Sequence, residues 1–352
     1  MSSATRQIGN STFHAIGFGA MGISTFYGAV ESDEERFKVL DAAHAAGCTF
    51  WDTSDVYGDS EQLIGKWCTF FILLHGPAHL KCPRFKRTGK RSDIFLCSKY
   101  GIRQPSFEVE GTPAYTKEAI DASLQKLGVD CIDLYYLHRV DVKTPIEHSV
   151  SAMAEAVKAG KIKHIGLSEC SADTLRRAHK VHPISAVQVE YSPFSLDIED
   201  PKIGLLATAR ELGVKIVAYS PLGRGLLTGQ YKSPAEFADD DFRKTIPRFS
   251  KENFPIILKL ADGLKAIGTK YNNATAGQVT LAWLLSNGDD IIPIPGTKKV
   301  KYLQENLSGG KIKLSKEDAE AVRKLASEAD SAPGERYPAF MMAQLFADTP
   351  LP

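Results

Sequence analysis

The sequence has little cysteine for its length and no long apolar segment. Six cysteines in 352 residues are too few for a disulfide-based scaffold, so we expect ordinary core cysteines in a reducing compartment. The longest uninterrupted apolar run, residues 70–74, is far shorter than the ~20 residues that cross a bilayer. The N-terminal segment also lacks the apolar core of a secretory signal. These absences predict a cytoplasmic protein with no membrane partner.

The chain also lacks an excess of charge of either sign. It has 43 basic and 42 acidic residues, which leaves a formal net charge of +1. Proteins that bind nucleic acid carry a marked basic surface. We therefore expect no nucleic-acid partner. A monomer is favoured, and the oligomeric state is left open.

Short β-branched or aromatic runs alternate with longer amphipathic segments along the whole chain, which indicates βα units around a parallel sheet. Eight such strands, each followed by a helix, favour a closed (β/α)8 TIM barrel over an open doubly wound sheet. We expect an α/β fold with a single domain over residues 1–352, a long loop after the seventh strand at 224–250, and a C-terminal helix at 315–329. The predicted strands are 14–18, 49–52, 94–98, 132–137, 164–167, 186–189, 215–219 and 291–294.

The segment G-F-G-A-M-G places Gly17, Gly19 and Gly22 at the spacing of a dinucleotide-binding fingerprint. That fingerprint needs a helix that starts at the glycines, whereas the first helix cap expected here is Ser32. The acidic residue at the end of the next strand, Asp52, is also too distant along the chain. A Rossmann fold is therefore disfavoured. The glycines are expected instead to let the backbone approach a flat ligand.

Four polar residues fall at the predicted C-terminal ends of strands, the face where barrel enzymes place catalysis: Asp52, Tyr57, Lys99 and His138. Each one alone is more often structural. Together, Lys99 can pair with Asp52 and lower the pKa of the Tyr57 phenol, while His138 binds the same substrate oxygen. This set predicts protonation of a carbonyl oxygen by Tyr57. No metal-ligand pattern accompanies it, so the missing component is a hydride donor, a nicotinamide cofactor.

The chain resembles the aldo-keto reductases from about residue 13 to residue 325, and within them most resembles fungal enzymes of the pyridoxal reductase type. The resemblance implies NADPH-dependent reduction of small aldehydes or ketones, with the four residues above as catalytic tetrad. The family's potassium-channel β subunits keep the tetrad but act as cofactor-sensing binding subunits, so that alternative stays open. The motifs that carry the resemblance are G-F-G-A-M-G, W-D-T-S-D-V-Y-G, I-G-L-S, Q-V-E-Y-S, A-Y-S-P-L-G-R-G and I-P-G-T-K with its following E-N.

The resemblance also implies the cofactor contacts. Ser168 and Gln188 would hold the nicotinamide carboxamide, and Tyr219 would stack on its ring. Many relatives carry Asn where this chain has Glu169, so the part of Glu169 in that contact is open. The implied cofactor residues are Gly19, Ala20, Met21, Ser168, Gln188, Tyr219, Ser220, Leu222, Gly223, Gly296, Thr297, Lys298, Glu305 and Asn306. The pocket residues are Phe26, Tyr27 and Arg139, with Phe194 and 337–342 as further pocket-wall residues.

The segment I-P-G-T-K-K-V-K supports the phosphate part of this set independently. A Gly-Thr turn that enters a helix offers backbone N–H groups to an anion, and Lys298, Lys299 and Lys301 add positive charge. Read alone, the segment could equally be a solvated basic face. Together with the tetrad, it favours phosphate binding.

Residues 68–84 interrupt an otherwise ordinary helix. Joining Trp67 directly to Phe85 would restore one apolar helical face. Codons that the residues of the insert allow would also fit an in-frame retained intron, with TGG-TGY at its start and an AGG arginine codon at its end. A zinc site is disfavoured, because the spacing matches no usual zinc finger and metal is not expected. The residues that raise the zinc question are Cys68, His75, His79 and Cys82.

We expect deletion of residues 68–84 to raise the soluble yield and the melting temperature. The insert would lie at the N-terminal face of the barrel, where variation affects stability more than chemistry, and its apolar run is an aggregation liability. Thermal melts and cofactor KM of the purified deletion variant check this, with KM expected to stay the same. A folded variant without cofactor binding would make the insert a functional element.

Overall fold

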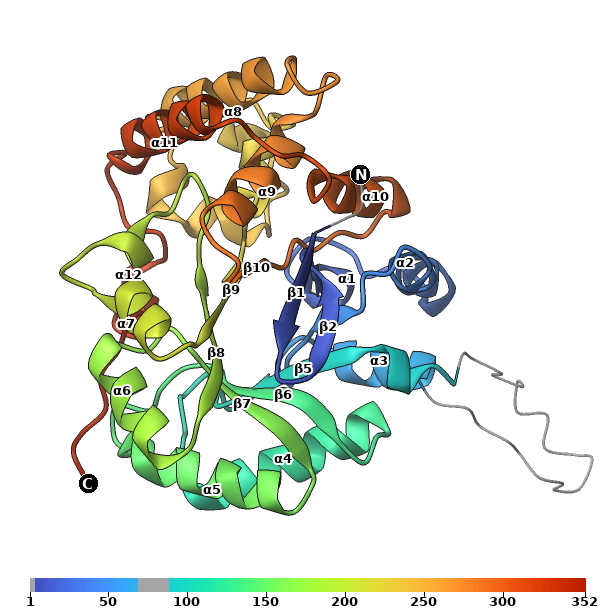
Figure 1. Ribbon diagram of the computed structural model, residues 1–352, viewed down its shortest axis with the longest axis vertical. Helices are drawn as coiled ribbons and strands as arrows, with labels where there is room; N and C mark the ends of the chain where they lie inside the picture. The colour runs from blue at the N-terminus through green and yellow to red at the C-terminus, as the bar shows by residue number, and fades with distance from the viewer. Residues whose placement is uncertain (1–3, 69–88) are drawn as a thin grey trace, which may run out of the picture.

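The computed structural model describes residues 4–68 and 89–352 of the chain. Eight parallel strands form one sheet in the order β10-β9-β8-β7-β6-β5-β4-β3. The first and last strands also meet, because Gly17 N donates to Pro293 O at 2.9 Å and Gly19 N donates to Pro295 O at 3.4 Å. These bonds close the sheet, and helices surround it (Figure 1). The predicted (β/α)8 barrel is confirmed.

Seven of the eight predicted strands are present, each within two residues of its predicted ends. The first prediction, 14–18, was wrong, since His14 ends a separate strand and the barrel strand contains only Phe18 and Gly19. The barrel strands are β3 (Phe18–Gly19), β4 (Phe50–Asp52), β5 (Phe95–Tyr100), β6 (Ile132–Leu137), β7 (Ile162–Ser168), β8 (Ile184–Glu190), β9 (Lys215–Tyr219) and β10 (Ile291–Pro293).

Residues before the barrel form an antiparallel hairpin of β1 (Thr5–Ile8) and β2 (Ser11–His14) that the sequence analysis missed. The ring of Phe13 lies 4.8 Å from that of Phe50 and 5.1 Å from that of Phe95, so the hairpin packs on the barrel interior. It lies in front of the barrel strands in Figure 1. The hairpin therefore covers the N-terminal end of the barrel and leaves the other end for the site.

Gly17 and Gly19 are needed for packing at the point where the barrel closes. A Cβ on Gly17 would come within 2.7 Å of the Phe50 ring, and one on Gly19 within 2.7 Å of Ile294 O. A single helical turn, α1 (Met21–Ser24), follows the glycines. One turn in a closed barrel is not the dinucleotide fold, so the Rossmann fold is excluded.

The helices follow the predicted βα alternation, with one long helix and the short helices α1 and α12 in addition. Helix α8 (Phe254–Gly268) was missed, although Ile257, Leu260 and Leu264 bury one face of it and Pro255 begins it. In Figure 1 it lies beside α11. The other helices are α2 (Asp33–Ala45), α3 (Ser60–Cys68), α4 (Pro113–Leu127), α5 (Ile146–Lys158), α6 (Ala172–Val181), α7 (Leu205–Glu211), α9 (Ala276–Ser286), α10 (Val300–Gly309), α11 (Lys316–Asp330) and α12 (Ala339–Met342).

The long loop after β9 is present and contains only short 3-10 turns. Most of the insert at 68–84 lies outside the described residues, as do His75, His79 and Cys82, so the zinc and intron hypotheses stay untested. Within residues 4–68 and 89–352, no group of His, Cys, Asp and Glu side chains could hold a metal ion. In the same part of the chain, no helix has the length and apolar character needed to span a membrane.

Candidate active site

Three of the tetrad residues lie at neighbouring strand ends, as predicted, and Tyr57 lies in the loop between β4 and α3. Asp52 ends β4, Lys99 lies near the end of β5, and His138 follows β6. Lys99 Nζ donates to Asp52 Oδ1 at 2.6 Å and to Thr53 O at 2.7 Å. The same ammonium lies 4.8 Å from the centroid of the Tyr57 ring. One buried cation therefore contacts both the carboxylate and the phenol.

The Asp52–Lys99 pair is sealed from solvent, with Lys99 fully buried and Asp52 2% exposed. Burial alone would lower the pKa of Lys99, but the charge of Asp52 raises that pKa above its usual value. Gln188 Nε2 donates to Asp52 Oδ2 at 2.8 Å and so satisfies the second carboxylate oxygen. Lys99 is thus held as a cation, and the amide of Gln188 stabilises the Asp52–Lys99 ion pair through Asp52.

The charge of Lys99 is only one of the influences on the pKa of Tyr57. Burial raises the pKa of the Tyr57 phenol, and the positive charge of Lys99 offsets part of that rise without reversing it. The expectation of a pKa below the usual value was therefore wrong. The phenol keeps its proton at neutral pH, as a proton donor must.

His138 lies against Tyr57, with ring centroids 5.7 Å apart and the rings nearly perpendicular at 85°. Burial, followed by the charges of Arg139 and Lys99, lowers the pKa of His138 well below its usual value, so the imidazole is neutral. Ser54 Oγ contacts Nδ1 at 3.1 Å and fixes the ring. Sequence analysis missed this role of Ser54, although the residue lies inside the D-T-S-D-V-Y-G motif.

Two of the predicted cofactor segments lie against each other. A Cβ on Gly296 would come within 2.6 Å of Gly19 O, so the segments 19–21 and 296–298 are in backbone contact. Ala20 N also donates to Asp52 O at 2.8 Å, which links the first segment to the tetrad. Lys298 Nζ donates to Tyr27 O at 2.5 Å and to Ala29 O at 2.8 Å. Backbone carbonyls alone hold this ammonium among the described residues.

The remaining predicted cofactor residues lie on the turn after β9 and on α10. Gly223 N donates to Ser220 O at 2.9 Å, and both residues have positive φ, 54° and 47°. Leu222 lies 3.7 Å from a Cβ built on Gly277 at the start of α9. Glu305 accepts from Thr275 Oγ1 at 2.7 Å, again at the start of α9. Asn306 is buried beside Glu305, so these segments meet around one helix N-terminus.

An aromatic rim connects the predicted pocket residues to the long loop. The rings of Phe26 and Phe242 are 6.5 Å apart, and those of Phe242 and Tyr337 are 6.4 Å apart. The guanidinium carbon of Arg243 lies 5.5 Å from the centroid of the Tyr27 ring. Phe242, which the sequence analysis did not single out, places the loop after β9 beside the pocket residues.

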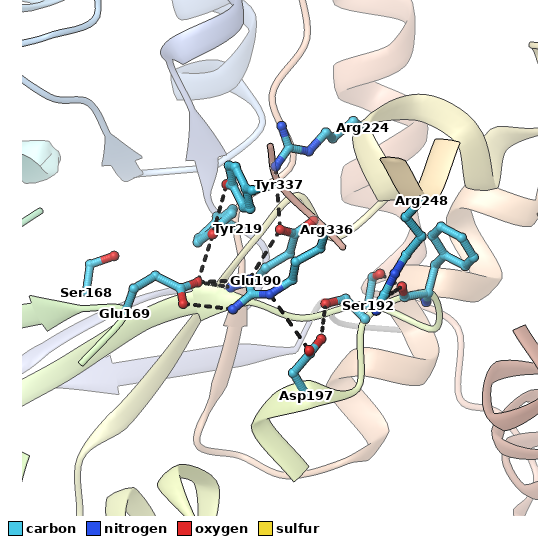
Figure 2. Close-up of polar contacts among 12 residues, drawn as sticks. Ser168, Glu169, Glu190, Ser192, Asp197, Tyr219, Arg224, Arg248, Arg336 and Tyr337 are labelled. Carbon is cyan, nitrogen blue, oxygen red and sulfur yellow. Dashed lines mark hydrogen bonds and ion pairs between the residues drawn. The ribbon is translucent and has the colours of Figure 1, made fainter. Parts of the chain in front are cut away.

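Glu169 fastens the C-terminal segment to the strand ends. Arg336 Nη2 donates to Glu169 Oε2 at 2.9 Å and Arg336 Nη1 donates to Oε1 at 3.1 Å, while Tyr219 Oη donates to Oε1 at 2.8 Å (Figure 2). Tyr219 Oη also lies 3.0 Å from Tyr337 Oη. The carboxylate is thus fully engaged by protein groups. Glu169 therefore serves this network.

A second carboxylate, Glu190, completes the cluster shown in Figure 2. Its Oε2 lies 3.4 Å from Arg336 Nη1 and 3.5 Å from Arg224 Nη2. The guanidinium of Arg224 in turn lies 4.6 Å from the centroid of the Tyr337 ring. Side chains from β8, the loop after β9 and the C-terminal segment therefore form one charged network beside Tyr219.

Comparison with known protein sequences identifies one family. A sequence model of the Aldo/keto reductase family matches residues 15–327. The chain is 62% identical over 353 residues to aldo-keto reductase str7 of Strobilurus tenacellus, covering 99% of this chain and 98% of that protein. It is 49% identical over 356 residues to aldo-keto reductase yakc [NADP(+)] of Schizosaccharomyces pombe, covering 99% of both chains.

Among solved structures, the fold resembles that of a glycerol dehydrogenase from Gluconobacter oxydans. The TM-score is 0.79 at 24% identity, covering 95% of this chain and 98% of that one. At this identity, the likeness concerns the barrel alone.

We expect Arg336→Met to lower the free energy of unfolding by about 3–5 kcal/mol, because it leaves buried carboxylates without their cation. Glu169→Gln combined with Arg336→Met should cost less than the sum of the two single changes. Urea unfolding of the single and double variants measures the coupling. Arg103→Met is a matched control, since its ion pair with Glu110 is 37% and 31% exposed and is worth at most about 1 kcal/mol. Strict additivity would contradict the network.

Proposed function

Because this chain belongs to the aldo/keto reductase family and is an NADP-dependent oxidoreductase, we propose that it reduces small aldehydes or ketones with NADPH. Tyr57 is the general acid of this reaction. The observation that carries the proposal is Lys99, whose ammonium lies 2.6 Å from Asp52 and 4.8 Å from the Tyr57 ring centroid. We place the enzyme in the cytoplasm.

The residues present fit a nicotinamide cofactor. The backbones of Gly19 and Gly296 are in contact, which brings two of the implied cofactor segments together, and Lys298 is a partly buried ammonium held by carbonyls. Bound NADPH would supply a hydride to the carbonyl carbon. Ser168 would bind the carboxamide and Tyr219 would stack on the ring. The pyrophosphate would lie along the segment 220–223 and the adenosine phosphate along 296–298, with Glu305 and Asn306 near the adenine.

The tetrad divides the proton chemistry among its members. Tyr57 donates its proton to the developing alkoxide, and the buried Lys99 ammonium stabilises the phenolate that forms. Asp52 keeps Lys99 charged and in place. The neutral imidazole of His138 is a hydrogen-bonding group for the same oxygen. The protonated phenol is the form of Tyr57 that carbonyl reduction requires.

We expect Tyr57→Phe to lower kcat for carbonyl reduction by about 10²- to 10⁴-fold, the usual contribution of a general acid. NADPH affinity should stay nearly the same, because the phenol makes no cofactor contact in this mechanism. Steady-state kinetics with an aldehyde panel and a fluorescence titration with NADPH measure the two quantities. A variant with more than about a tenth of wild-type kcat would remove Tyr57 from the acid role.

The same aldehyde panel separates the enzyme from a cofactor-sensing binding subunit. Tight NADPH binding with no turnover of any aldehyde by the wild-type protein would favour the binding subunit.

Lys298→Ala tests the choice of cofactor. If Lys298 reads the 2′-phosphate, the variant should bind NADPH more weakly by about 1.5–3 kcal/mol, the scale of one charge-assisted hydrogen bond. NADH binding should barely change, since NADH has no such phosphate. Titrations with both cofactors check this. Equal losses for both would show that Lys298 does not contact the phosphate.

A further inference from the structure

Arg139 is a buried cation with no ionic partner among the described residues. Its side chain follows His138 at the end of β6, and the residue is 6% exposed. A buried charge without a counter-ion is costly, so native proteins rarely leave one unpaired. Every other Arg or Lys that is buried in the described chain has a carboxylate at ion-pair distance; these are Arg6, Arg36, Lys99, Arg243 and Arg336.

One side of the Arg139 guanidinium is hydrogen-bonded to the protein, and the other side has no hydrogen-bond partner among the described residues. Nη1 donates to His138 O at 2.7 Å and to Ser168 Oγ at 3.4 Å. Nε and Nη2 have no partner in the described residues, yet neither is among the buried nitrogens sealed from water. Both atoms therefore face accessible space. Together they form the side of a guanidinium that binds a carboxylate through two parallel hydrogen bonds.

The hydrogen bonds from Nη1 to His138 O and Ser168 Oγ hold Arg139 beside the tetrad. Burial lowers the pKa of Arg139, but the charges of Tyr219, Tyr337, Glu169 and Tyr57 raise it above its usual value. Glu169, the carboxylate among these groups, is already bound to Arg336 and Tyr219. No protein anion is therefore free to neutralise Arg139. A negative group there would arrive with the substrate.

We propose that Arg139 binds the carboxylate of the substrate, and that the substrates are 2-oxo acids, in which the carboxylate is bonded to the reacting carbonyl. This inference rests on the proposed function. The carboxylate is unchanged in the reaction. The carbonyl carbon gains the hydride as NADPH becomes NADP⁺, and the oxygen gains the Tyr57 proton, which yields a 2-hydroxy acid. Arg139 is the residue after His138 and is bonded to its carbonyl, so a carboxylate next to the reacting carbonyl suits this position.

Benzoylformate and its methyl ester test the proposal, because they share one ketone and differ only in charge. The ester is the more electrophilic of the two, so a higher kcat/KM for the acid in the wild-type enzyme reports recognition of the carboxylate. Arg139→Met should lower the acid-to-ester ratio of kcat/KM by about 10- to 100-fold, and Arg139→Lys should retain part of it. Arg176→Met is the matched control, because it removes an exposed arginine on α6 and should not change the ratio.

Calorimetry of benzoylformate binding to the NADP⁺ complex gives a readout without turnover. Affinity should fall in Arg139→Met in step with the kinetic ratio. Equal loss on acid and ester, or a wild-type preference for the ester, would overturn the inference while the proposed function stands. If Arg139→Met does not fold, the wild-type ratio of kcat/KM for benzoylformate and its methyl ester tests the inference by itself. Absence of NADPH binding and of any carbonyl reduction would instead overturn the proposed function.

Discussion

The site depends on the ion pair between Asp52 and Lys99, which is buried at the centre of the barrel's C-terminal end. Taking both charges out of water is costly, and the cost is offset by their attraction and by further hydrogen bonds, from Lys99 to Thr53 O and from Gln188 to Asp52. The pair keeps a cation beside a phenol that burial would otherwise leave far from ionisation. The register of β4 and β5 brings the two residues together, since Asp52 pairs with Cys97 and Lys99 follows Cys97 by two residues.

A second charged network, around Glu169, performs a different task. It joins the ends of β7 and β8 to Arg224 of the long loop and to Arg336 of the C-terminal segment. Tyr219 takes part through its hydroxyl, so the ring proposed to stack on the cofactor and the segment over the pocket are held by one carboxylate. Cofactor site and pocket wall are therefore mechanically linked in this chain.

Much of the barrel could be predicted because βα alternation is a local signal. The proximity of Asp52, Lys99 and His138 could be predicted because they lie at the ends of consecutive strands, and strand ends share one face. The β1–β2 hairpin was missed because a run such as residues 11–18 is equally compatible with one strand, and only packing of Phe13 on Phe50 decides. The partners of Glu169 could not be predicted, since Arg336 lies far along the chain and no spacing rule relates them. The pKa of Tyr57 was misjudged because burial cannot be read from a motif.

The seam between β3 and β10 has a consequence for how the chain acquires its shape. Gly17 N bonds to Pro293 O, so the pairing that completes the barrel joins residues that lie far apart in the sequence. Contacts of such large separation form late, because the intervening chain must first lose its freedom. During synthesis, the opening strand therefore waits with an unpaired edge until β10 has left the ribosome. Because Gly17 and Gly19 have no Cβ, they can enter that final pairing without displacing the Phe50 ring or the Ile294 carbonyl.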